Sequence, residues 1–226
     1  MYDATNLSSK RRMNFLKSIA PIDCVKMCTV IATPFTDCVA RDSIRERNVG
    51  YNVILKQMRQ FEMPDISEGW DLVHVVHGNS IKPDLNTFFI HEIEMEHDSP
   101  YHKETVQQHM RMAANLAMKA GESSSFYEAV LYHDVGKFYT KVFHNIKGEP
   151  TESAHFYGHE NVSAYMYLTS SNFKGIEELL LIQYHMMCFK GKKAWDRLEK
   201  RLGADFIEKL KRFNKYDNEG RCGNEN

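Results

Sequence analysis

The sequence predicts a mainly α-helical protein, with a small α/β segment at residues 1–80 and an all-helical domain at residues 85–226. Two observations lead to this division. Before residues 78–88, short β-rich runs alternate with helical stretches, whereas after them the hydrophobic residues recur at helical spacing. No apolar run approaches the roughly 20 residues that a membrane-spanning helix needs, so no membrane segment is expected.

The α/β segment is expected to hold two strands. Residues 25–32 (VKMCTVIA) form a continuous apolar run with β-branched residues, which predicts a buried strand. Residues 72–76 (LVHVV) predict a second short strand, ended by the turn sequence HGNS. A helix is expected over residues 10–19, where Ser8 or Ser9 can cap its start and Pro21 stops it, and another over residues 52–61, which ends before Pro64.

The second domain is expected to consist of helices alone. Hydrophobic residues share one face of residues 104–120, and Gly121 is placed to end that helix. The serines at 123–125 offer an N-cap for a helix over residues 126–133. Further helices are expected over residues 160–168, 176–187, 192–201 and 204–216.

The composition is that of a folded globular chain and argues against several function classes. Lys and Arg total 29 against 30 Asp and Glu, and this formal net charge of -1 argues against a dedicated nucleic-acid clamp but leaves room for a local phosphate site. Hydrophobic residues make up 42% and charged residues 26%, which is typical of ordered domains. The first residues lack the apolar core of a signal peptide, and five cysteines do not suggest a disulfide framework, so a cytoplasmic protein is expected.

Histidines gather in the second domain, where nine of the 11 lie between residues 91 and 185. The central feature is His133-Asp134 in the run LYHDVGK, where an imidazole and a carboxylate at a helix end can approach one ion. We expect Gly136 to permit a turn there, with Lys137 one step beyond. His109 lies 24 residues before His133.

Imidazole and carboxylate ligands favour a borderline or hard divalent ion, and the lack of cysteine among them disfavours a structural zinc site. Such an ion would activate water and hold a phosphoryl oxygen, while Lys137 would neutralise charge on a phosphate. The candidate residues further along the chain are His159 in YGHE, His185 in QYHM and Asp217 in KYDNE.

Residues 99–220 resemble the HD-domain superfamily of metal-dependent phosphohydrolases, through the order H…HD…D. The resemblance implies that His109, His133, Asp134 and Asp217 hold a divalent ion. It further implies that Asp134 can accept the proton of the attacking water, and that Lys137 stabilises charge on the phosphate.

Two further histidines resemble those of superfamily members that hold two metal ions. His159 and His185 would either complete a second metal site or bind the substrate phosphate. The runs YHKETVQQHM, LYHDVGK and FYGHE are most similar to the HD domains of CCA-adding tRNA nucleotidyltransferases and similar stand-alone proteins. This implies hydrolysis of a phosphomonoester or phosphodiester in a phosphorylated small molecule, a nucleotide or an RNA end. One or two ions are expected, from among Mn²⁺, Fe²⁺, Ni²⁺, Co²⁺, Zn²⁺ and Mg²⁺.

The first segment resembles the C-terminal half of a polynucleotide-kinase-type P-loop kinase, beginning at its DATN element. No G-x-x-x-x-G-K-[ST] loop occurs in the sequence, so this chain alone is not expected to have kinase activity. Two alternatives to a hydrolase follow: a non-catalytic module that binds a nucleotide or RNA end, and a fragment of a kinase–HD repair enzyme. The resemblance rests on residues 3–6 with Arg11 and Arg12, residues 32–34, Arg41, Arg45, Arg47, residues 61–64, Glu68 and Gly69.

Other polar residues are given structural interpretations. A solvated face explains Arg41, Arg45 and Arg47 as well as phosphate binding does, and Cys24 and Cys28 are expected in the core. Loop positions, or positions behind the ligands, are expected for His97, His102 and His155, and positions along a strand for His74 and His77. Two aspartates compete with Asp217 for the last ligand position, namely Asp196 and Asp205.

Overall fold

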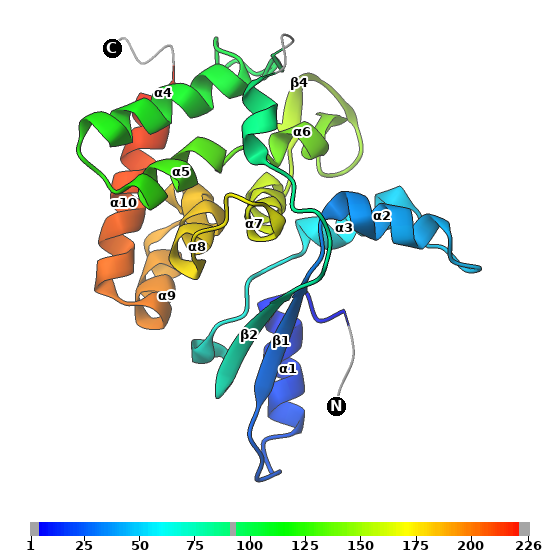
Figure 1. Cartoon of the computed structure of the whole chain (residues 1–226). Helices are drawn as coiled ribbons and strands as arrows, with labels where there is room; N and C mark the ends of the chain where they lie inside the picture. The colour runs from blue at the N-terminus through cyan, green and yellow to red at the C-terminus, as the bar shows by residue number, and fades with distance from the viewer. Residues whose placement is uncertain (1–4, 91–93, 222–226) are drawn as a thin grey trace. The chain divides into compact units, whose positions relative to one another are not determined.

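The computed structural model describes residues 5–90 and 94–221 of the chain. The chain divides into two compact units, residues 1–82 and 83–226. Helices dominate the described residues, whose few short strands form two separate two-stranded sheets (Figure 1). The mainly α-helical fold class, with a small α/β part first, is therefore confirmed. Within the described residues, no helix combines the length and hydrophobicity needed to cross a membrane.

The first unit is built on a parallel pair of strands. β1 (Met27–Ala32) pairs with β2 (Leu72–His77) in a register that places Met27 opposite Leu72. Parallel neighbours require a crossover connection, and the chain between them supplies one through two helices. The helical elements of this unit are α1 (Ser9–Ser18), α2 (Phe35–Ser43), α3 (Tyr51–Arg59) and the 3-10 turn η1 (Ile66–Glu68).

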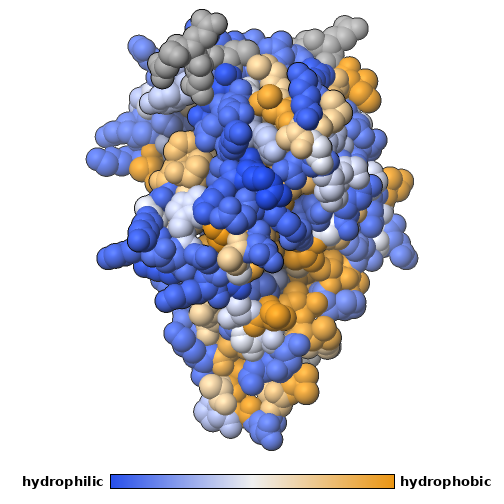
Figure 2. All heavy atoms as spheres, turned by 90° about the vertical axis from the view of Figure 1, so that its left-hand side faces the viewer, coloured by the Kyte–Doolittle hydropathy of each residue, from blue (hydrophilic) through white to orange (hydrophobic). Residues whose placement is uncertain are grey.

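The prediction that residues 25–32 form a buried strand is wrong in its burial. Met27 is 58% exposed and Ile31 is 63% exposed, and exposure alternates along β1. A continuous apolar run is typical of strands covered on both faces, whereas this sheet has two strands within the described residues and buries one face better than the other. Figure 2 shows hydrophobic side chains among hydrophilic ones in the lower part of its view, where this sheet lies.

A buried ion pair ties α1 to the segment before β2. The Nε and Nη2 atoms of Arg12 each donate to a carboxylate oxygen of Glu68 at 2.7 Å. Arg12 Nη1 also donates to the carbonyls of Asn6 and Leu7, and Trp70 donates its indole N–H to Glu68. This pairing gives Arg12 and Glu68 a structural role. The DATN element of the kinase resemblance lies partly outside the described residues.

The second unit is a helical bundle. α4 packs against α5 and α10, and α8 packs against α5, α7 and α10. The centre of the bundle holds fully buried side chains from these helices, among them Val130, Ile182, Leu210 and Phe213. The helical elements are η2 (Leu85–Phe89), α4 (Val106–Lys119), α5 (Ser124–Tyr132), α6 (Lys137–Thr140), α7 (His159–Thr169), α8 (Ile176–Tyr184), η3 (His185–Phe189), α9 (Lys192–Leu202) and α10 (Ala204–Glu219).

Local capping signals place the first two long helices of this unit correctly. Thr105 caps α4, and it forms a reciprocal capping box with Gln108. Gly121 follows α4 with a φ of 78°, the left-handed conformation that ends many helices. Ser123 caps α5 by accepting the N–H of Phe126 at 3.2 Å.

One element of the second unit was not expected from the sequence. β3 (Lys141–His144) and β4 (Pro150–Phe156) form an antiparallel hairpin between α6 and α7. Its strands are short and half-exposed, so their hydrophobic pattern is weak. The hairpin matters for function because it directly precedes His159, at the first residue of α7.

Candidate metal centre

The end of α5 presents the two adjacent candidate ligands. His133 follows the last residue of α5, and Asp134 begins the turn that leads into α6. The side chains of His133 and Asp134 are 0% and 2% exposed, so both ionisable groups lie inside the bundle. Lys137, the first residue of α6, places its Nζ atom 2.6 Å from Asp134 Oδ2.

Gly136 is required here for a reason that differs from the expected one. Its φ of -65° is ordinary helical backbone, so no unusual turn is made. Instead, a Cβ at this position would lie 2.3 Å from the carbonyl oxygen of His159 and 2.7 Å from the N–H nitrogen of Ser163. The missing side chain therefore lets the His-Asp turn lie against the first turn of α7, and the N–H of Gly136 donates to Ser163 Oγ at 2.8 Å.

Close approach of two helices brings the remaining ligands of the H…HD…D pattern together. A Cβ at Gly220 would lie 2.8–2.9 Å from Ala113 atoms, so glycine lets the end of α10 pack against α4. As a result, Asp217 Oδ1 lies 3.0 Å from His109 Nε2 and 3.6 Å from His133 Nε2.

All four candidate histidines are oriented in the same way. Each places Nδ1 within hydrogen-bond distance of a backbone carbonyl, which can only accept a hydrogen bond, so Nδ1 carries the hydrogen and a neutral ring has its lone pair on Nε2. Histidines that bind metal ions are commonly oriented by such bonds. The Nδ1–oxygen distances are 3.2 Å for His109 to Gly220, 2.7 Å for His133 to Val130, 2.8 Å for His159 to Phe156 and 2.6 Å for His185 to Ile182.

The carboxylate of Asp134 lies between two groups of imidazoles. Its Oδ2 atom is 3.3 Å from His133 Nε2 and 3.6 Å from His109 Nε2. Its Oδ1 atom is 3.2 Å from His159 Nε2 and 3.7 Å from His185 Nε2. Asp134 can therefore offer one oxygen to each group.

A divalent cation would satisfy the ligand atoms of the cluster better than the hydrogen bonds among them do. His133 Nε2 and Asp134 Oδ1 are buried and make no hydrogen bond of acceptable geometry. His159 Nε2 lies 3.1 Å from His185 Nε2, and two lone pairs at this distance repel unless a cation or a proton lies between them. Each of two groups, His109–His133–Asp217 and His133–Asp134–His185, has ligand atoms within 4.8 Å of one another.

The electrostatics of the cluster also favour a cation. Burial raises the pKa of both aspartates, yet the neighbouring imidazoles, and Lys137 beside Asp134, outweigh it and hold both values well below the usual range. Burial lowers the pKa of His133, but the two carboxylates overturn this and raise it to about 10. Burial and two neighbouring imidazoles lower the pKa of His185 to about 3. The buried carboxylates thus attract positive charge, and a neutral His185 keeps its lone pair.

Residues 106–216 match the family model of the HD domain. These residues form an HD domain. The match runs from the start of α4 to the residue before Asp217, so it includes every other member of the cluster. No curated protein and no solved structure is similar enough to the chain to match. HD domains form a superfamily of metal-dependent phosphohydrolases, and the histidine and aspartate groups of this HD domain can hold a divalent metal.

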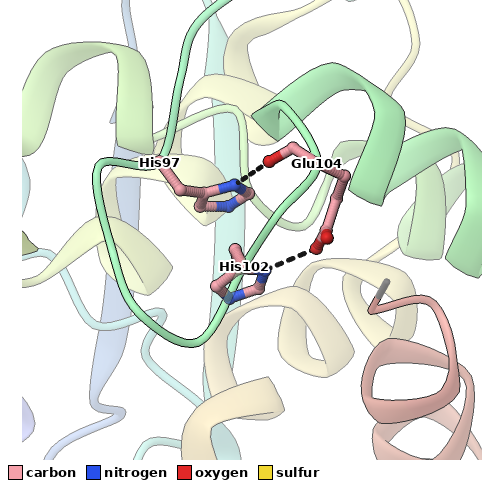
Figure 3. Close-up of side chains that lie close together, drawn as sticks. All are labelled: His97, His102 and Glu104. Atoms are coloured by element: carbon pink, nitrogen blue, oxygen red, sulfur yellow. Dashed lines mark hydrogen bonds and ion pairs between the residues drawn. The ribbon is translucent and has the colours of Figure 1, made fainter. Parts of the chain in front are cut away.

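Sequence reasoning missed two residues at the edge of the HD-domain cluster. Glu104 Oε1 lies 3.7 Å from His109 Nδ1, and Arg221 Nη2 lies 3.8 Å from Asp217 Oδ1. His97 and His102, which were expected in loops or behind the ligands, bond to Glu104 (Figure 3). The only signal was the crowding of two histidines and a glutamate just before the cap of α4.

The competing candidates are not part of the cluster. Asp196 and Asp205 are exposed, and His155 stacks on Tyr157 with ring centroids 5.2 Å apart. Arg41, Arg45 and Arg47 are exposed residues of the first unit, while Cys24, expected in the core, is exposed and Cys28 only half-buried. The four described cysteines are free, and Cys222 lies outside the described residues.

One cavity in the second unit does not belong to the site. It has a volume of about 680 Å³ and is lined by Phe88, Gln107 and Phe138, among other residues. None of the candidate ligands lines it, and neither does Lys137. The cluster itself is nearly closed, and its more open side is marked by His159 and Lys137, whose side chains are 7% and 9% exposed.

Proposed function

We propose that the protein is a phosphohydrolase that acts on a phosphomonoester or phosphodiester of a nucleotide or an RNA end. The observation that carries this proposal is the convergence of four imidazole Nε2 atoms and two carboxylates in a buried cluster, with a lysine ammonium at its more open side. Imidazole and carboxylate together suit divalent transition metals, and an adjacent cation suits a phosphate.

The ligand atoms are proposed to hold two ions rather than one. Asp217, His109 and His133, with Asp134 Oδ2, would hold the first. His159 and His185, with Asp134 Oδ1, would hold the second. Ions so held supply Lewis acidity and lower the pKa of bound water.

The residues of the chain have distinct roles in this proposal. Asp134 acts mainly as a ligand, because its pKa is held well below the usual range and one oxygen is paired with Lys137, which makes it a weak acceptor for a proton. Lys137 stabilises negative charge on the phosphoryl oxygens. The backbone carbonyls behind the imidazoles keep the rings in position when the substrate binds.

The substrate is proposed to enter from the side of Lys137 and His159. The side chains of His133, His109 and His185 are at most 1% exposed, which makes Lys137 and His159 the more accessible members of the cluster. A phosphate approaching from their side would meet the Lys137 ammonium. The burial of the other ligands keeps bulk water from them and strengthens electrostatic interactions within the site.

The test is hydrolysis by the metal-reconstituted protein. Phosphomonoesters, 2′,3′-cyclic nucleotides and dinucleotides are screened with Mn²⁺, Co²⁺, Ni²⁺, Zn²⁺ and Mg²⁺. We expect turnover of at least one class, and a loss of about 100-fold or more in the folded variants Asp134→Ala and Asp217→Asn. The matched control is Asp196→Asn, which changes an exposed aspartate and should leave turnover unchanged.

The result that overturns the proposal is full metal-dependent activity in folded Asp134→Ala. A wild-type protein that binds nucleotides but hydrolyses none of the three classes would instead favour a non-catalytic module that binds a nucleotide or RNA end. The resemblance of the first unit to part of a P-loop kinase stays a prediction, and the activity proposed here does not depend on it.

A further inference from the structure

The segment before α4 carries a second group of ionisable side chains, which the HD-domain ligand set does not use. His97 and Glu104 are 1% and 3% exposed, and the side chain of His102 is 10% exposed. Glu104 binds both histidines: its backbone carbonyl accepts from His97 Nδ1 at 2.9 Å, and its carboxylate lies 2.6 Å from His102 Nδ1 (Figure 3).

The ligand atoms of His97, His102 and Glu104 lie close enough together to hold a metal ion, but the orientation of the two imidazole rings disfavours this. The rings of His97 and His102 are stacked, with centroids 3.9 Å apart and planes 11° from parallel. The lone pair of an imidazole lies in the plane of its ring, so two stacked rings do not direct their lone pairs at one point. In addition, the Lys137 ammonium already lies 3.1 Å from His97 Nε2.

The protonation of His97 follows from its two partners. A backbone carbonyl can only accept, so His97 Nδ1 carries the hydrogen. An ammonium can only donate, so His97 Nε2 presents its lone pair to Lys137. His97 is therefore a neutral acceptor, and burial together with the nearby Lys137 charge lowers its pKa to about 3, in agreement with this assignment.

The Lys137 ammonium has three N–H donors, and the described residues use two of them. One donates to Asp134 Oδ2 at 2.6 Å and one to His97 Nε2 at 3.1 Å. The ammonium also lies 5.3 Å from the ring centre of Phe156. One N–H is left for a ligand, and the side chain of Lys137 is 9% exposed.

The segment that carries His97 is itself fixed to the hairpin. Asp98 forms an ion pair with Lys141, whose Nζ atom lies 2.5 Å from Asp98 Oδ2. The carbonyl of Asp98 also accepts a hydrogen bond from the N–H of Ala154 at 2.8 Å. Asp98 adopts a φ of 47°, which is uncommon for a residue other than glycine and is maintained here by these contacts. His97 is thus a rigid support rather than a mobile side chain.

We propose that His97 is a positioning residue: by accepting one N–H of Lys137, it directs the remaining N–H of that ammonium to a phosphoryl oxygen of the substrate. This inference rests on the proposed function, because it assigns the phosphate-binding step of that site. Glu104 supports His97 through its backbone carbonyl and binds the ring of His102, which stacks on His97.

Two amide variants separate the two bonds of His97. In His97→Asn, the shorter amide can still donate to the Glu104 carbonyl but does not reach Lys137. In His97→Gln, the longer amide can present its oxygen to Lys137. The control is His144→Asn, because His144 also places Nδ1 3.0 Å from a backbone carbonyl but is exposed and lies in the hairpin.

The first readout is the rate at which Lys137 is acetylated in the metal-loaded full chain, measured by mass spectrometry. We expect this rate to rise about tenfold in His97→Asn, as the loss of one charge-assisted hydrogen bond implies, and to stay at the wild-type value in His97→Gln and His144→Asn. Inorganic phosphate should slow acetylation of Lys137 in the wild type, a measurement that needs no variant.

The second readout is binding of inorganic phosphate by calorimetry, which should weaken about tenfold in His97→Asn and recover in His97→Gln, with metal content unchanged. The inference is overturned if folded His97→Asn keeps the acetylation rate and the phosphate affinity of the wild type. It is also overturned if His97→Asn loses metal while Lys137 is acetylated as slowly as in the wild type. Failure of the proposed hydrolysis is a separate result: the wild type would hydrolyse no substrate, although Lys137 acetylation would still differ between the variants as expected.

Discussion

Replacement of Gly136 by alanine tests how the HD-domain cluster is assembled. The added Cβ would lie 2.3 Å from the carbonyl oxygen of His159 and 2.7 Å from the backbone nitrogen of Ser163. An ordinary contact of this kind is about 3.4 Å, so the first turn of α7 would have to move by about 1 Å. Overpacking of this kind costs up to about 3 kcal/mol, and the lower entropy of the unfolded alanine variant returns at most about 1 kcal/mol.

The net effect is a loss of about 2 kcal/mol in the free energy of unfolding. With a typical urea m-value of about 2 kcal/mol/M, the midpoint should fall by about 1 M at unchanged m. Since the shift moves the backbone of His159, we also expect Gly136→Ala to bind less metal than the wild type. Urea unfolding followed by circular dichroism gives the first value, and elemental analysis gives the second.

A matched variant shows whether the effect belongs to this contact. Gly191 has a φ of -72°, and a Cβ there would meet nothing within 4 Å. Gly191 is the N-cap of α9, where alanine is somewhat less favourable than glycine, so Gly191→Ala should lower the free energy of unfolding by less than about 1 kcal/mol, which is below the loss expected for Gly136→Ala. A Gly136→Ala protein with the midpoint and metal content of the wild type would refute the packing argument.

Three further predictions concern the two units and the ions. Glu68→Gln leaves the buried Arg12 without its carboxylate and should destabilise the first unit by about 3–5 kcal/mol, measured by urea unfolding, whereas the exposed Glu46→Gln should change little. Chelation should lower the unfolding temperature of the metal-loaded protein, because bound ions at about 100 times their Kd contribute about 2.7 kcal/mol; a calorimetric scan unchanged by chelator would contradict this. The hydrogen bond from Arg212 lowers the pKa of Glu122, so its contribution is present above about pH 4.5 and disappears as the pH falls through the lowered value. Glu122→Gln should thus cost less than about 1 kcal/mol at pH 7 and progressively less as the pH falls through the lowered value, and a cost that does not change with pH would count against the ion pair.

Several features were predictable because they depend on neighbours in the sequence. The end of α4 at Gly121 and the start of α5 at a capping serine were expected, because these signals act within one helical turn. The Thr105 cap of α4 was seen only in the structure. The pairing of His133 with Asp134 at a helix end is also local. The role of Asp217 could be expected only from the resemblance to the HD family, because its distance from His109 depends on how α10 packs against α4.

The features that were missed depend on tertiary contacts. Gly136 has ordinary helical backbone angles, and only the position of α7 shows why a side chain does not fit there. The hairpin before His159 has short, half-exposed strands without a strong alternation. His97 lies in a loop that no periodicity marks, and its contact with Lys137 joins residues that are 40 positions apart.

Metal content of the purified, Mn²⁺-reconstituted protein tests the central claim most directly. The claim is that Asp134 offers one oxygen to each of two groups of imidazoles. We expect about two ions per chain in the wild type, about one in His185→Ala and almost none in folded Asp134→Ala. A wild-type protein that binds no ion, or an Asp134→Ala protein that keeps both, would contradict this account of the site.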